Sequence, residues 1–410
     1  MKKNYLRISA VISTAALIAL SVVPALADSA TNDTTGYNSD NFTSVKNINN
    51  VSVTNVSDAF ISNNITDNAN TGGNQANYNT MGGDITTGNA TTHTKLENLA
   101  NINTVLIDPG MNAGATYIAG NSITGAESMN TADILNKNTV KVLNDSTAVL
   151  RSMVNSAANT GNNKASYNTD GVGGSILTGQ ASSTVELENR ANDNAVCVKG
   201  LAGGSGGIVG NSITGYNSDN FANLKNINLV DVSNISDALV ENRVRSYANT
   251  GYNEANYNTM GGDITTGKGT SGVSVGTEAN INTVLVDVGF GDPTDTSGNS
   301  ITGAESMNVS DIVNQNTFKV ENISNKCRST DCHDYCKPIL NAGGKIIGYE
   351  NCPEWGVHNV VVDEANTGEN KASYNTFAGQ ILSGIAQASK EIAVRLNDAW
   401  VEIGPGVSQH

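Results

Sequence analysis

A unit of about 89 residues occurs four times along this chain, and this repetition constrains the fold more than any other feature. One marker contains a Thr-Gly pair whose glycines, Gly36, Gly125, Gly215 and Gly303, are separated by steps of 89, 90 and 88 residues. A second marker, of the form ANTGxNxAxYNT, begins at residues 69, 158, 248 and 365. Units with a fixed period stack on their neighbours and share one continuous core. The sequence therefore predicts a repeat architecture.

The units alternate between two types in the order A-B-A-B. Type A shares the segments TGYNSDNF and NYNTMGGDITTG, and type B shares TGAESMN and KASYNT. The last unit contains an insert at residues 325–358, because its second marker begins 117 residues after the previous one. We assign residues 1–27 to a signal peptide, 28–118 to unit A1, 119–209 to B1, 210–297 to A2 and 298–410 to B2.

The second marker contains a set of residues with the spacing of a β-strand. In each copy four residues at every second position are identical, whereas the positions of Glu254 and Asn256 between them vary. Alternate residues of a strand lie on one face. We therefore predict that the invariant set faces the core, and that Ile264, flanked by glycine-rich segments, lies in a second short strand. The predicted core ladder consists of Asn74, Ala76, Tyr78, Thr80, Asn163, Ala165, Tyr167, Thr169, Asn253, Ala255, Tyr257, Thr259, Asn370, Ala372, Tyr374 and Thr376.

Elsewhere, short segments alternate apolar and polar residues, as in β-strands, and no long segment shows the 3.6-residue apolar period of a helix. Residues 388–400 fit a short helix or a closing strand. The chain holds 60 Asn and 42 Gly yet no Asn-Gly pair, the leading signal for a tight hairpin. Wide arcs between strands are therefore expected.

These patterns predict an all-β fold, a β-solenoid of four units. Stacked Asn residues can then form hydrogen-bonded ladders between coils about 4.8 Å apart. Coils of roughly 20 residues would place four in each unit and give a rod of roughly 80 Å. Four tandem β-sandwich domains of the same length are the alternative.

The N-terminal segment has the pattern of a secretory signal peptide: a basic start, a short apolar run and small residues at Ala25 and Ala27. The run is short for a membrane span. Removing its three basic residues changes the formal charge from −15 to −18. So acidic a chain repels nucleic acid and anionic lipid. We expect a secreted or cell-surface protein with no nucleic-acid partner and no membrane span after cleavage.

The core N-T-G-x-N-x-A of the second marker resembles the curlin repeat of bacterial amyloid fibres. The resemblance covers about ten residues in each unit. The marker differs in spacing by about one residue and has Asn where curlin repeats have Gln. The pattern is also similar to Asn/Thr/Gly-rich repeats of bacterial surface β-solenoid proteins. The resemblance implies an extracellular fibre or a surface layer.

Four of the five cysteines lie in the insert of unit B2. In an exported chain Cys327, Cys332, Cys336 and Cys352 are disulfide candidates, with three possible pairings. A metal site that uses His333 is the alternative, although the spacing lacks the paired C-x-x-C of zinc sites. Cys197 is the odd thiol: a buried free cysteine, a link to another chain or a partner of the insert.

Candidate catalytic and metal residues are few. Asp170 completes an N-T-D sequence similar to that of pectin-cleaving β-helices, but the other units have Met or Phe there. Asp84 and Asp263, beside glycines, are weak Ca²⁺ candidates. We expect no cofactor, no defined metal site beyond loose Ca²⁺ binding, and no enzymatic activity.

The preferred function is that of a secreted structural or adhesive repeat protein of the bacterial surface or extracellular matrix, with the capacity to form fibres. Its partners would be other copies of itself or cell-surface and matrix components. A β-helix that binds or cleaves polysaccharide, with a glycan as partner, is the alternative.

Overall fold

The computed structural model shows an all-β chain whose strands stack in parallel. It describes residues 3–12, 17–21, 29–108, 117–169, 174–199, 207–287, 295–324, 337–340, 346–350, 356–377 and 379–404. No helix occurs among these residues, and residues 388–396 and 399–400 lie in strands. The predicted all-β solenoid is confirmed, because parallel strands stack into sheets that run through all four repeats.

Each strand pairs with the equivalent strand of the next repeat. Asn41 lies beside Asn130, 89 residues further along, and Asn130 lies beside Asn220. One repeat is therefore one turn of the solenoid, called a rung here, and the described residues form four rungs. The expected coil of about 20 residues is wrong. Tandem sandwiches are also excluded, because the strands of the described repeats pair between repeats.

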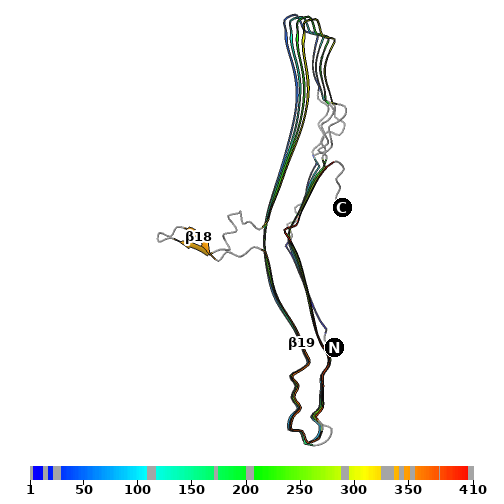
Figure 1. The fold of residues 1–410 in the computed structure, drawn as a ribbon, viewed down its shortest axis with the longest axis vertical. Helices are drawn as coiled ribbons and strands as arrows, with labels where there is room; N and C mark the ends of the chain where they lie inside the picture. The colour runs from blue at the N-terminus through cyan, green and yellow to red at the C-terminus, as the bar shows by residue number, and fades with distance from the viewer. Residues whose placement is uncertain are drawn as a thin grey trace.

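The rung is long and flat, with two layers (Figure 1). One layer is a sheet whose complete strands have 31 residues, or about 100 Å at the usual rise of about 3.3 Å per residue. Its strands are β4 (Asp40–Asn70), β8 (Met129–Asn159), β12 (Asp219–Asn249), β16 (Met307–Ser324) and β19 (Gly356–Asn366).

Three shorter sheets complete the return path of each rung. The longest of them packs against the middle and lower parts of the 31-residue strands in Figure 1. It comprises β6 (Ala90–Asp108), β10 (Ala181–Val198), β14 (Gly269–Asp287), β21 (Ala386–Leu396) and β22 (Ala399–Gly404). The other two comprise β3 (Ser29–Asp33), β7 (Tyr117–Ser122), β11 (Gly207–Ser212) and β15 (Thr296–Ser300), and β5 (Ile85–Thr86), β9 (Ile176–Leu177), β13 (Ile264–Thr265) and β20 (Ile381–Leu382).

Inward-facing asparagines explain why such long strands are not interrupted. Asn130 is buried, and its Nδ2 donates to Oδ1 of Asn220 at 2.9 Å while its own Oδ1 accepts from Asn41. A buried amide costs little when its hydrogen bonds are made. An in-register stack supplies a partner at every rung, so a polar residue need not mark a turn. Residues that begin further ladders include Asn32, Asn49, Asn55, Asn74, Asn79, Asn101 and Asn103.

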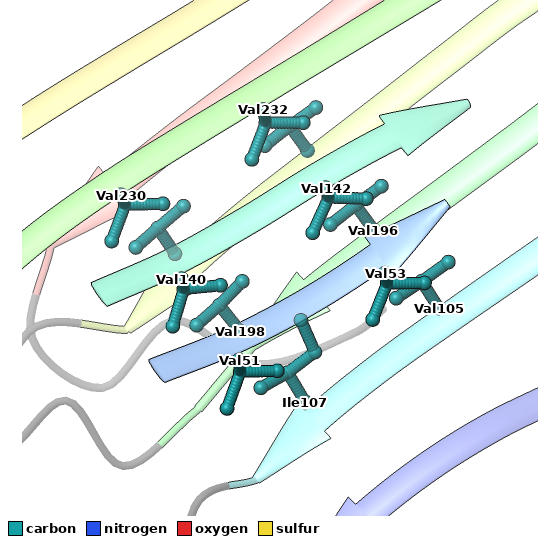
Figure 2. Packing of buried hydrophobic residues seen from close by; sticks show 12 residues of the cluster. Val51, Val53, Val105, Ile107, Val140, Val142, Val196, Val198, Val230 and Val232 are labelled. Atoms are coloured by element: carbon teal, nitrogen blue, oxygen red, sulfur yellow. The ribbon is translucent and has the colours of Figure 1, made fainter. Parts of the chain in front are cut away.

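Between these ladders the core is aliphatic. Val51, Val140 and Val230 occupy successive strands of the long sheet, and Val198 and Ile107 face them from the opposite layer (Figure 2). Mixed clusters of Ala, Val, Ile and Leu continue the core toward both ends of the rung, and the cluster beside β7 also contains the buried Tyr117. The core is therefore a thin, continuous seam, which agrees with the low aromatic content of 5%.

The two sequence markers form the two ends of the flat rung. The Thr-Gly marker connects β7 to β8, and the ANTG marker connects β8 to β9. At the second end a Cβ built on Gly161 would lie 2.0 Å from the carbonyl oxygen of Gly251 in the next rung. Glycine is therefore required where the backbones of neighbouring rungs approach most closely.

A row of asparagines bends the sheet formed by β6, β10 and β14. Asn192 has a φ of 54° and follows Ala191, and both residues are buried, so the alternation of inward and outward residues is broken there. Its Nδ2 donates to the carbonyl of Asp237 at 2.8 Å and to Oδ1 of Asn280 at 2.9 Å. Asn tolerates the left-handed conformation better than most residues. Asn101, Asn280 and Asn397 repeat this conformation.

The insert leaves the solenoid in the middle of the long sheet. Ser324 pairs beside Ser236 and Gly356 beside Leu239, so the offset between rungs rises from 88 to 117 residues. The strands β17 (Lys337–Leu340) and β18 (Ile346–Glu350) form an antiparallel hairpin, which lies to the side of the two-layered body (Figure 1).

Candidate functional site

The predicted core ladder is only half correct. Asn253 and Ala255 are buried, as predicted, but Tyr257 is 45% exposed and Thr259 is also exposed. Tyr257 has a φ of 58°, in the left-handed region, which turns the chain and ends the period-two alternation. The tyrosines and threonines of this set are exposed in all four rungs: Tyr78, Thr80, Tyr167, Thr169, Tyr257, Thr259, Tyr374 and Thr376.

The tyrosines form a ladder on the outside of the solenoid. Rings of successive rungs stack with centroids 4.8 Å apart and planes within 2–5° of parallel. Their faces cover one another, so the inner rings offer solvent their edges and hydroxyls. A sugar ring that packs on an aromatic face would find a free face only at the ends of the row, on Tyr78 and Tyr374.

The inward place predicted for tyrosine is taken by the asparagine that follows it. Asn258 is 1% exposed, and Oδ1 of Asn258 accepts hydrogen bonds from the backbone N–H and Nδ2 of Asn168. Gly262 leaves room for this row, because a Cβ there would lie 2.4 Å from the amide of Asn375. The signal was present in the sequence: the asparagine is identical in all four copies of the marker.

The cysteines contribute little to the described site. Cys327, Cys332, Cys336 and Cys352 lie outside the described residues, so their predicted disulfides stay a prediction. Cys197 is 1% exposed and lies in register with Leu106 and Leu285 of the neighbouring rungs. Cys197 therefore occupies a buried position that is leucine in both neighbouring rungs.

The two Ca²⁺ candidates are separated by an intervening rung. Oδ1 of Asp84 accepts from the N–H of Ser175 at 2.9 Å, and Oδ1 of Asp263 accepts from the N–H of Gln380 at 2.8 Å. Each carboxylate thus accepts a hydrogen bond from the backbone of the next rung along the chain. Within the part of the chain that the structure describes, no group of three or more His, Cys, Asp or Glu could hold a metal ion.

Charged residues form columns along the outside of the stack, and in several columns the A-B alternation places opposite charges on neighbouring rungs. Lys164 of B1 lies 3.5 Å from Glu254 of A2, and Arg151 of B1 lies 2.9 Å from Glu241 of A2. Like charges on neighbouring strands are unfavourable. The two alternating unit types therefore turn these two columns into ion pairs.

One shallow groove of about 430 Å³ collects carboxylates from three rungs. Glu97, Glu188 and Glu278 line it beside Arg190 and Arg395. Both guanidinium groups are within 4.0 Å of the carboxylate of Glu278, so this carboxylate is ion-paired. Asp170, the residue that suggested a pectin-cleaving site, lies outside the described residues.

A Tyr–Glu column follows the Thr-Gly end of the rung. The hydroxyl of Tyr37 donates to Oε2 of Glu127 at 2.6 Å, and Tyr216 bonds to Glu305 in the same way. The hydrogen bond to Glu127, followed by the charge of that carboxylate, raises the pKa of Tyr37 above its ordinary value. The hydrogen bond to Glu305 raises the pKa of Tyr216.

Alkaline titration tests this column. The pKa of each phenol is raised on folding, so its bond stabilises the fold below pH 10.0, the ordinary Tyr value, and is lost as pH rises above that value. We expect Glu127→Gln, which keeps an acceptor oxygen but removes the charge, to lower the pKa of Tyr37. Phenolate absorbance, assigned with Tyr37→Phe, measures it. An unchanged pKa in Glu127→Gln would contradict the contribution of the Glu127 charge.

The site is thus a set of periodic columns and not a pocket of convergent groups. No family model, curated protein or solved structure matches the chain. None of the described residues forms a helix long and apolar enough to cross a membrane.

Proposed function

We propose that this protein is an exported structural building block of the bacterial surface or extracellular matrix, and that it forms β-rich fibres. The observation that carries the proposal is the set of ladders that continue from rung to rung, asparagine inside and tyrosine outside. Such a stack is linear, and each rung is bound mainly to its neighbours. A scaffold needs this property, whereas a catalytic site needs groups that converge on one point.

The described chemistry supports a scaffold. Buried amides bond to equivalent amides, and the outer charges of Arg151, Lys164 and Glu278 are engaged with opposite charges of other rungs. The exposed tyrosine row and the hairpin of the insert would supply contacts to matrix components. Residues 1–27 would direct export and would be removed from the exported chain.

The secreted protein provides the test. We expect light scattering to show growth with concentration, and negative-stain electron microscopy to show unbranched filaments with a 4.8 Å meridional repeat in fibre diffraction, the spacing of the tyrosine ladder. Compact monomers at high concentration would contradict fibre formation. A glycan array and a reducing-sugar assay test the alternative function. Hydrolysis of a polysaccharide would favour a polysaccharide-cleaving β-helix over a scaffold.

A further inference from the structure

We propose that the fibre, on which this inference rests, grows head to tail by in-register stacking of two different faces. The B2 face is the open side of the last rung, formed by β15, β16 and β19–β22. The A1 face is the open side of the first rung, formed by β3–β6. The partner is a second copy of this chain, placed so that its A1 rung follows B2 as A2 follows B1.

On the B2 face, inward-facing aliphatic side chains are partly exposed because no further rung covers them. Ile392 and Val401 are each 45% exposed, whereas Val275 and Val284, which occupy the same inward positions one rung below, are 1% and 0% exposed. Burying apolar surface is worth roughly 25 cal/mol per Å². A further rung with inward aliphatic side chains would bury this row, and the A1 rung carries Leu96 and Val105 there.

The asparagine ladders give the two faces opposite hydrogen-bonding character. In most ladders Nδ2 donates toward the B2 end, as in the series from Asn41 through Asn130 to Asn220. The B2 face therefore presents amide N–H groups, for instance at Asn322, and the A1 face presents amide oxygens, for instance at Asn55. Stacking B2 on A1 joins donors to acceptors, whereas stacking two B2 faces would oppose donors.

The A1 face already holds a parallel pair of strands in the required register. In the full chain β1 (Lys3–Ile12) and β2 (Leu17–Ser21) pair in parallel with β6. Lys3 lies beside Thr91 and Leu17 beside Thr104. In the B2 rung Gln387 lies beside Thr270 and Trp400 beside Thr283, which are the equivalents of Thr91 and Thr104.

The N-terminal strands thus occupy the positions that β21 and β22 of a second copy would take. Because residues 1–27 contain both strands, their removal would free the A1 face for stacking. Growth would therefore be confined to the processed chain.

Charged columns match across the proposed contact. Glu391 occupies the outer position whose equivalent in A1 is Lys95, so the two would lie side by side with opposite charges. On the inner face, Ser156 and Ser246 of the two middle rungs occupy one column, and Asp67 and Asp363 take the same position in the first and last rungs. Lys390 occupies the position facing Asp363, since its A1 equivalent Thr94 bonds to Asp67. An ammonium group would therefore lie between the two carboxylates.

A zero-length carbodiimide cross-link tests the register. Within one chain Lys95 and Glu391 are three rungs apart, which at 4.8 Å per rung is too far for direct coupling. We expect mass spectrometry of filaments grown from mixed ¹⁴N and ¹⁵N chains to show Lys95–Glu391 links between copies. Chain 28–410 should assemble, and chain 1–410 should not.

Two substitutions that each introduce a charge, one on the B2 face and one on the lateral surface, provide a second test. Ile392→Lys places a charge on the B2 face, where the side chain is exposed in a single copy, so the monomer is expected to fold. It should raise the critical concentration for assembly at least about tenfold, the effect of about 1.4 kcal/mol. Val360→Glu in the same rung introduces a charge on the lateral surface, where Val360 is 59% exposed and lies beside Arg243, and this variant should assemble normally.

The outcomes separate the two proposals. If chain 28–410 forms no filaments, fibre formation itself fails. If filaments form without the Lys95–Glu391 link, or if Ile392→Lys leaves the critical concentration unchanged, head-to-tail stacking is wrong and fibre formation stands. Assembly of chain 1–410 at the same rate as chain 28–410 would overturn the blocking role of β1 and β2.

Discussion

Gly161→Ala is expected to disrupt the stacking of rungs at one end of the solenoid. The added Cβ would lie 2.0 Å from the carbonyl oxygen of Gly251 and 2.8 Å from the carbonyl carbon of Thr250. These are backbone atoms, so no side chain can rotate away, and the two rungs must separate. Overpacking of this kind costs on the order of 3 kcal/mol. Urea unfolding followed by circular dichroism measures the loss of stability.

Gly276→Ala provides the matched control. Gly276 lies in β14 and has an ordinary φ, and a Cβ added there would meet no atom within 4 Å. Alanine at this position should leave stability unchanged or raise it slightly, because glycine in a strand is entropically unfavourable by about 0.5–1 kcal/mol. Equal losses in the two variants would show that general glycine content, and not the contact with the next rung, determines stability.

Asn192→Ala is expected to be the second severe substitution. It removes the amide that bonds to the carbonyl of Asp237 and to Asn280, and it forces alanine into a φ of 54°. Loss of a buried hydrogen-bond partner costs about 1–3 kcal/mol, and the left-handed conformation adds about 1–2 kcal/mol for a residue with a Cβ. The expected total is therefore about 2–5 kcal/mol of unfolding free energy.

Asn192→Gly separates the two contributions, because glycine keeps the backbone conformation and loses only the amide. We expect it to be more stable than Asn192→Ala by about 1–2 kcal/mol. Glu188→Ala, at an exposed position of the same strand, should change stability by less than about 0.5 kcal/mol. If alanine and glycine at position 192 were equally stable, the left-handed backbone would not be a source of strain.

The class of fold was predictable because the repeat forces stacking, but the size of the coil was not. Short alternating bursts separated by Asn suggested turns every 20 residues or so. In β8, however, Asn136, Asn138 and Asn144 are inward residues of one continuous strand. Their partners are the equivalent asparagines of the next repeat, about 90 residues away. A local pattern does not distinguish an amide that bonds across rungs from one that ends a strand.

The inner and outer faces of the second marker were predicted correctly up to Ala255 and wrongly after it. A period of two holds only while the backbone stays extended, and Tyr257 adopts a left-handed conformation. The sequence contains no residue that requires this conformation there, since tyrosine is not a usual choice for it. The A-B alternation, by contrast, was visible in the sequence, but its pairing of Lys164 with Glu254 required the register of the rungs.

Because each repeat forms one rung, duplicating a repeat in the gene would add one rung to the solenoid. Duplicating the A2 unit beside itself would place Glu254 next to its own copy, whereas duplicating an A-B pair keeps Glu254 next to Lys164 or its equivalent. Each added pair would thicken the molecule by two rung spacings and leave its outline in cross-section unchanged. Duplication by pairs, from A-B to A-B-A-B, is therefore the route that preserves these ion pairs between rungs.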